Sequence, residues 1–157
     1  MNTILMVCLG NICRSPLAEG LLRSKIEKLN IDIYIDSAGT GNSHIGEHPD
    51  NRTIVNAKKH GVDISKLKAR QFQVDDFDKF DIIFAMDSSN YSDIISLARN
   101  ENDKHKVEMI LNRLYPDSNM AVPDPYFGDE QGFENVFILL EKVCDVIANS
   151  LAKTNEH

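Results

Sequence analysis

Residues 3–16, which read TILMVCLGNICRSP, contain the pattern that decides the fold class. The first six of these residues are apolar apart from Thr3, and they have the length of a strand that is buried on both faces. Serine and proline then indicate a helix start, with Ser15 as the N-cap and Pro16 as the first helical residue. The stretch therefore predicts a buried strand, a short loop and a helix.

Apolar runs and helical patterns continue to alternate along the chain. After the first helix we expect strands over residues 31–36, 80–86 and 107–111, and helices over residues 49–60, 88–98 and 133–151. This alternation is typical of an α/β fold in which a parallel sheet carries helices on both faces. Ligands bind such sheets beyond the carboxyl ends of the strands, so the loop after the first strand is the first place to look for a site.

Composition limits the class of protein. The chain has 157 residues, 42% hydrophobic and 26% charged, as expected for one compact domain over residues 1–157. Seventeen basic and 24 acidic residues give a formal net charge of -7, so we expect neither nucleic acid nor a membrane as a partner. Three cysteines, no apolar run of membrane-spanning length and no signal peptide pattern favour a location in the reducing cytoplasm.

The loop after the first strand combines a cysteine with the features of an anion site. Gly10 and Asn11 tolerate positive φ, so the loop can turn its backbone N–H groups inward at the start of a helix, where such groups bind phosphate. Arg14 can close this ring and hold two oxygens of a tetrahedral oxyanion. These dipoles, Arg14 and the Ser15 hydroxyl all favour a Cys8 thiolate, which is then placed to attack phosphorus.

Residues 7–16, VCLGNICRSP, resemble the signature loop of the low molecular weight protein tyrosine phosphatases. The resemblance extends over almost the whole chain, through DSAGT at 36–40, KARQ at 68–71, AMD at 85–87 and DPY at 124–126. It implies a three-layer sandwich with a four-stranded parallel sheet in the order 2-1-3-4. It also implies a phosphotyrosine-protein phosphatase, a hydrolase of phosphoric monoesters that uses no metal ion and no other cofactor.

The resemblance gives three residues catalytic roles. It implies that Cys8 attacks phosphorus and forms a cysteinyl-phosphate while Arg14 holds the phosphoryl oxygens. Asp124 would protonate the leaving phenolate and then activate a water molecule. Asp124 also lies between Pro123 and Pro125, which stiffen the backbone, and a stiff loop suits a catalytic acid because small misplacements are costly.

Further residues are expected around the substrate. In the loop, the residues expected to bind the phosphoryl group are Leu9, Gly10, Asn11, Ile12, Cys13 and Ser15. Tyr126 and Phe127 resemble the aromatic wall of the family's crevice, which suits a phenyl ring, and His44 would occupy the opposite wall. The implied partners are phosphotyrosine-containing proteins, with inorganic phosphate or another oxyanion in the loop.

Other roles are expected for the support of the loop and for the protection of its nucleophile. We expect Asn11 to adopt a left-handed conformation, and the resemblance implies that Ser37 pins its side chain. Cys13 lies five residues from Cys8 and could trap an oxidised Cys8 as a disulfide, which would protect it from irreversible oxidation.

Three alternative functions fit the sequence less well. An arsenate reductase would need further cysteines to relay a disulfide, and residues 86–90 contain none. A protein arginine phosphatase on the same scaffold would resemble this loop but carry a threonine at the position of Ile12. A non-catalytic phosphate-binding module would need neither the thiolate of Cys8 nor the acid Asp124.

Overall fold

The computed structural model describes residues 3–155 and has a parallel sheet at its centre. The strands are β1 (Thr3–Cys8), β2 (Tyr34–Gly39), β3 (Ile82–Ala85) and β4 (Val107–Met109). They lie in the order β2-β1-β3-β4, and every neighbouring pair is parallel. The strand order and the parallel sheet that the resemblance implies are therefore confirmed.

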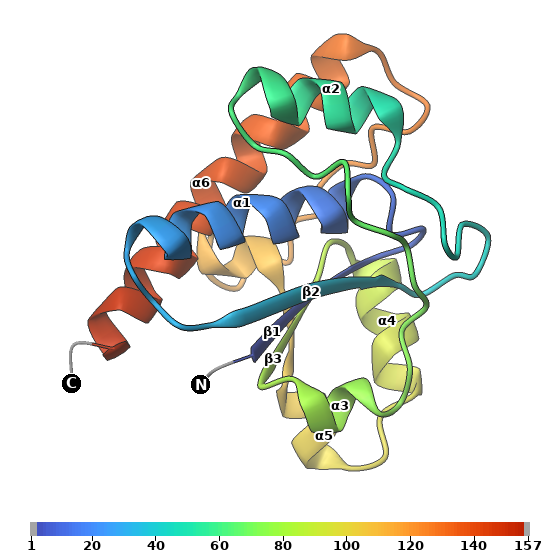
Figure 1. Ribbon diagram of the computed structural model, residues 1–157. Coiled ribbons are helices and arrows are strands. Elements are labelled where there is room, and N and C mark those ends of the chain that lie inside the picture. Colours follow the sequence, from blue (N-terminus) through green and yellow to red (C-terminus); the bar gives the residue numbers. More distant parts are fainter. Residues whose placement is uncertain (1–2, 156–157) are drawn as a thin grey trace.

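Helices cover both faces of this sheet (Figure 1). On one face lie α1 (Arg14–Lys28), α2 (Asn51–Lys59) and α6 (Glu130–Asn155). On the other face lie α3 (Asp76–Lys79), α4 (Ser88–Ser96) and α5 (Glu101–His105). A 3-10 turn, η1 (Ile110–Arg113), follows β4. The molecule is the predicted three-layer sandwich, and within its described part no helix is long and apolar enough to cross a membrane.

Strand β1 contributes to two separate apolar cores because its side chains alternate between the faces of the sheet. Ile4 and Met6 pack in the core under α1, α2 and α6, while Leu5 and Val7 pack in the core under α3 and α4. These four side chains are completely buried, which explains the continuous apolar run. Cys8 continues the first set and so ends the strand on the side of α1.

The second strand is shifted relative to the predicted range 31–36. Asn30 has a φ of 55°, and the N–H of Ile31 donates to the carbonyl of Ile26, so these residues terminate α1 instead of starting a strand. Strand β2 begins at Tyr34 because its pairing with β1 runs from Thr3 onward. The partner strand therefore determines its limits, which the alternation of apolar residues cannot reveal.

The predicted N-cap of α1 is wrong. The helix begins at Arg14 with Cys13 in the cap position and no side-chain capping bond. The hydroxyl of Ser15 lies instead within hydrogen-bonding distance of the Cys8 sulfur and accepts from the side-chain amide of Asn11. Pro16 is still tolerated because it lies in the first turn, where an N–H has no partner within the helix.

Other boundaries differ by a few residues. Strand β4 ends at Met109, two residues before the predicted end, because the chain turns into η1. The short helices α3 and α5 were not predicted, since four or five residues are too few to show a helical period. The predicted stop of α2 is confirmed: His60 is the C-cap, and Gly61 follows with a φ of 82°.

Candidate active site

The loop between β1 and α1 is anchored through its carbonyl oxygens. Four of them accept hydrogen bonds from backbone N–H groups: Cys8 from Thr40 at 2.9 Å, Leu9 from Gly41 at 2.9 Å, Ile12 from Asp50 at 2.7 Å, and Cys13 from Leu17 at 3.3 Å. In a planar trans peptide the N–H of the next residue points the opposite way. The N–H groups of residues 9, 10, 13 and 14 therefore face away from these donors, toward the inside of the loop, where they can bind an anion.

Asn11 holds this loop in shape. Its φ of 58° confirms the expected left-handed conformation, which costs a residue with a side chain about 1–2 kcal/mol. Its buried side-chain amide donates to Ser15 Oγ at 2.8 Å and to Ser37 Oγ at 2.9 Å, and its Oδ1 accepts from the N–H of Arg70 at 3.0 Å. At about 0.5–1.5 kcal/mol each, these three bonds offset the cost of the conformation.

Both serine hydroxyls accept a hydrogen bond from the same side-chain amide, that of Asn11, which leaves the proton of each hydroxyl available to an acceptor. Ser37 donates its proton to Oε1 of Glu19 at 2.6 Å. Ser15 has two acceptors within reach, the Cys8 sulfur at 3.0 Å and the carbonyl of Ala38 at 3.4 Å. The shorter contact, with the sulfur, allows a hydrogen bond between the hydroxyl and Cys8 in which either atom can be the donor.

Arg14 is buried, and its guanidinium is fixed by protein groups on one edge. Nη1 donates to Oδ2 of Asp87 at 2.8 Å and to the carbonyl of Val122 at 2.9 Å. Nη2 lies 3.7 Å from Oδ2 of Asp124. Asp87 is itself the N-cap of α4, because its Oδ1 accepts from the N–H of Asn90 at 2.7 Å. The contact of Asp87 with Arg14 spans 73 positions, and sequence reasoning missed it.

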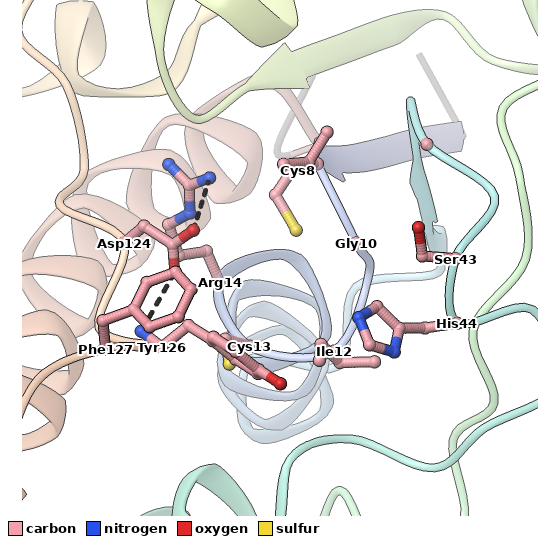
Figure 2. Close-up of a pocket in the computed structure, with 12 residues that line it drawn as sticks. Cys8, Gly10, Ile12, Cys13, Arg14, Ser43, His44, Asp124, Tyr126 and Phe127 are labelled. Carbon is pink, nitrogen blue, oxygen red and sulfur yellow. Dashed lines mark hydrogen bonds and ion pairs between the residues drawn. The ribbon is translucent and has the colours of Figure 1, made fainter.

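A cavity of about 260 Å³ opens over the loop (Figure 2). It is lined by Cys8, Leu9, Gly10, Ile12, Cys13 and Arg14 of the loop, by Gly41, Ser43 and His44, and by Asp124, Tyr126 and Phe127. Gly41 and Ser43 were not among the predicted residues. Two residues expected to bind substrate, Asn11 and Ser15, do not line the cavity, because their side chains bond to each other instead.

Aromatic rings form one wall of this cavity. Phe127 is 95% exposed and stands edge-on to Tyr126, with ring centroids 4.9 Å apart. His44 lies on the opposite side of the opening, 6.4 Å from the ring of Tyr126, and its Nδ1 contacts Glu47 at 2.9 Å (Figure 2). Asp124 belongs to the same wall as Tyr126, whose N–H donates to Asp124 Oδ1 at 3.1 Å.

Gly10 was expected to supply a positive φ, but its lack of a side chain instead makes room for His44. Gly10 has no positive φ; among the described residues the glycines with positive φ are Gly46 and Gly61. A Cβ on Gly10 would lie 3.1 Å from the ring of His44, so the absence of a side chain lets His44 lie close over the loop.

Cys13 and Cys144 lie in buried surroundings that keep their thiols protonated. Burial raises the pKa of both the Cys13 and the Cys144 thiol to about 12, so both carry their protons at neutral pH. All three cysteines of the chain are free of disulfide bonds.

The groups offered to a ligand suit an anion. Inward-facing amides and the Arg14 guanidinium provide donors and positive charge at the base of the cavity. Within residues 3–155 there is no cluster of three or more His, Cys, Asp or Glu side chains that could hold a metal ion.

A cysteine at the end of a parallel strand, an anion loop of backbone amides and an arginine beside an aspartate define a phosphoryl-transfer site on an α/β fold. The family model "Low molecular weight phosphotyrosine protein phosphatase" matches residues 3–157. The chain therefore belongs to this family of hydrolases.

Individual relatives match over almost their whole length. The chain is 40% identical over 152 residues to the low molecular weight phosphotyrosine protein phosphatase of Schizosaccharomyces pombe, covering 95% of this chain and 96% of that protein. It is 38% identical over 159 residues to the low molecular weight protein-tyrosine-phosphatase YfkJ of Bacillus subtilis, covering 99% of both. A protein tyrosine phosphatase from Entamoeba histolytica, crystallised with Hepes in the active site, superposes with a TM-score of 0.90 at 34% identity and 99% coverage of both chains.

Proposed function

We propose that residues 1–157 form one protein-tyrosine-phosphatase domain, which hydrolyses phosphotyrosine in proteins and small aryl phosphates. The observation that carries this proposal is the meeting of Cys8, Arg14 and Asp124 in one cavity whose base is an amide-lined loop. The same chemistry lets inorganic phosphate or another oxyanion bind in the loop. A nucleophile that must stay reduced suits the cytoplasm, where we place the protein.

In the first step the Cys8 thiolate attacks phosphorus. The S–P bond forms as the bond between phosphorus and the phenolic oxygen breaks, and the electron pair leaves with that oxygen. The loop amides and Nη2 of Arg14 stabilise the equatorial oxygens. Because Asp87 and Val122 already hold Nη1, the guanidinium is oriented before substrate binds.

Asp124 transfers a proton in each of the two steps. It first donates its proton to the leaving phenolic oxygen, which a poor leaving group requires. As a carboxylate it then takes a proton from water, and the oxygen of that water attacks phosphorus and breaks the S–P bond. Inorganic phosphate and the free Cys8 thiolate are the products. The Asp124 side chain is 46% exposed, so water can reach it.

The cavity walls support an aryl ester as the substrate. Tyr126, Phe127 and His44 surround the opening, and Leu9 and Ile12 add apolar surface. A flat phenyl ring buries its faces against such walls, and Ile12 stands where a protein arginine phosphatase would carry a threonine. This favours phosphotyrosine over phosphoarginine as the substrate.

Hydrolysis of p-nitrophenyl phosphate by chelator-treated protein tests the proposal, with phosphotyrosine and phosphoarginine assayed in parallel. We expect turnover of the aryl ester and of phosphotyrosine, and none by Cys8→Ser. A wild-type protein without turnover, together with a Cys8→Ser variant that still binds phosphate, would show a binding module instead. A preference for phosphoarginine would replace the substrate class.

We also propose that Cys13 protects Cys8 from irreversible oxidation by forming a disulfide with it. Both residues line the cavity. Treatment with peroxide followed by reductant should restore the activity of the wild type but not that of Cys13→Ser. Equal recovery of the two proteins would remove this role.

A further inference from the structure

Arg52, in the first turn of α2, lies outside the cavity but contacts the segment that carries Asp124. Its Nη2 donates to the carbonyl of Tyr126 at 2.8 Å. Its guanidinium is held in place by Asp50, with Nε 3.0 Å from Oδ1 and Nη2 2.9 Å from Oδ2. This hydrogen bonding is the main reason why the pKa of Asp50 is lowered.

Two aromatic rings also hold the Arg52 guanidinium. Its central carbon lies 4.7 Å from the ring centre of Phe133 and 5.5 Å from that of Tyr126. Phe133 is buried in the first turns of α6, so Arg52 is packed between the Tyr126 segment and a core residue. Such cation–π contacts fix the plane of the guanidinium as well as its position.

The helix that carries Arg52 is tied to the anion loop. The N–H of Asp50 donates to the carbonyl of Ile12 at 2.7 Å. The same residue therefore contacts the loop with its backbone and Arg52 with its carboxylate. Through Asp50, the position of Arg52 is set relative to the loop that holds Cys8.

The segment from Val122 to Tyr126 is thus attached at both ends by an arginine. At Val122 the carbonyl accepts from Arg14 at 2.9 Å, and the N–H donates to the carbonyl of Met86 at 2.8 Å. At Tyr126 the carbonyl accepts from Arg52. Asp124 lies midway, two residues from each attachment, and its Oδ1 accepts from the N–H of Tyr126.

We propose that Arg52 is a positioning residue that holds Asp124 at the distance and angle needed for proton transfer to the leaving group. The inference rests on the proposed role of Asp124 as general acid. Without Arg52, the attachment at Val122 remains, but the Tyr126 side of the segment can shift. A misplacement of about 1 Å can reduce a rate roughly a hundredfold, so a partial shift should have a measurable effect.

The dependence on the leaving group distinguishes positioning of the acid from a general loss of structure. We would measure kcat/KM of Arg52→Ala for phenyl phosphate, whose leaving group needs a proton, and for p-nitrophenyl phosphate, whose more acidic leaving group needs one less. We expect a loss of about tenfold for phenyl phosphate and less than about twofold for p-nitrophenyl phosphate. Arg52→Lys keeps the positive charge but loses the two-pronged guanidinium, so it should show the same pattern more weakly. This variant replaces Arg52→Ala in the test if the alanine variant does not fold.

Arg113, at the end of η1, provides a matched control. It also forms a forked pair with a carboxylate, Glu108, at 3.0 and 2.7 Å, and lies 5.3 Å from the ring centre of Phe84. Arg113→Ala should change neither substrate's kcat/KM. Asp124→Asn should show the leaving-group pattern most strongly, and adding Arg52→Ala to it should cause no further change in the ratio of the two substrates.

The outcomes separate the inference from the function on which it rests. If Asp124→Asn lacks the leaving-group pattern, the proposed role of Asp124 is wrong. If Asp124→Asn shows the pattern but Arg52→Ala lowers both substrates equally, or neither, then Arg52 does not position the acid. A rise in KM for phosphotyrosine peptides alone, with phenyl phosphate unchanged, would make Arg52 a peptide contact and would also overturn the inference.

Discussion

The hydroxyl oxygen of Ser15, in the first turn of α1, lies 3.0 Å from the sulfur of Cys8, which is the last residue of β1. The Asn11 amide donates to the same oxygen, so the hydroxyl proton is free to point at the sulfur. The sequence pattern predicts this serine as the N-cap of α1, but the helix has no side-chain capping bond, and the Ser15 hydroxyl contacts the nucleophile instead. The helix α1 therefore begins without a side-chain capping bond, and the Ser15 hydroxyl lies where it can donate to the Cys8 sulfur.

Replacement of Ser15 by alanine should slow both alkylation and catalysis. A hydrogen bond to a charged group contributes about 1.5–3 kcal/mol, so we expect a roughly ten- to hundredfold loss of kcat/KM. The rate of Cys8 alkylation by the neutral reagent iodoacetamide at pH 7 should fall as well. Ser43→Ala is the control, since Ser43 lines the same cavity. Unchanged alkylation in Ser15→Ala would show that this hydroxyl does not act on the sulfur.

Two substitutions of Asn11 should separate conformation from hydrogen bonding. Asn11→Gly keeps access to a φ of 58° and loses the side-chain bonds, whereas Asn11→Ala loses both. We expect the free energy of unfolding, measured in urea, to be lower for the alanine variant by about 1–2 kcal/mol than for the glycine variant. Equal values for the two would contradict a role for the left-handed backbone.

The three cysteines should react selectively. Because burial raises the pKa of Cys13 and Cys144 to about 12, iodoacetamide at pH 7 should label Cys8 alone in the folded protein, as read by peptide mass mapping. An unfolded thiol loses its proton at a lower pH, so the folded state binds more protons between the two values. The two buried thiols therefore make the free energy of unfolding decrease as the pH rises through about 9 to 12. Labelling of Cys13 at pH 7 at the rate of Cys8 would contradict this prediction.

Glu19 should make stability depend on pH in the opposite sense to an ordinary ion-paired carboxylate. Burial, the largest effect, raises its pKa above the ordinary 4.5, although Ser37 and Arg23 act against this. The folded state therefore keeps the proton to higher pH than the unfolded state, and the free energy of unfolding falls as the pH rises through that window. Glu19→Gln should lose this part of the pH dependence. In urea titrations from pH 4 to 7, the free energy of unfolding of the variant should therefore rise relative to that of the wild type as the pH increases. Parallel curves for the two proteins would disprove the assignment.

The layers of the fold could be predicted from the sequence because β1 is an apolar run and α6 carries an apolar stripe from Phe133 to Leu151. The limits of β2 could not, since they depend on where Thr3 and Cys8 end its partner strand. In the site, Cys8 and Arg14 share one loop whose residue types carry the anion chemistry. Asp87 and Arg52 could not be found in this way, because each acts on a group more than 70 positions distant, with no local pattern.

Detection of a phosphoryl group on Cys8 tests the central claim most directly. The Asp124→Ala variant lacks the base that activates water, so acid quenching during turnover of p-nitrophenyl phosphate should trap the intermediate. The account predicts that mass mapping finds one phosphoryl group on the peptide containing Cys8, and none when Cys8 is replaced by serine. Turnover with the phosphoryl group on another residue, or with no covalent intermediate under these conditions, would contradict it.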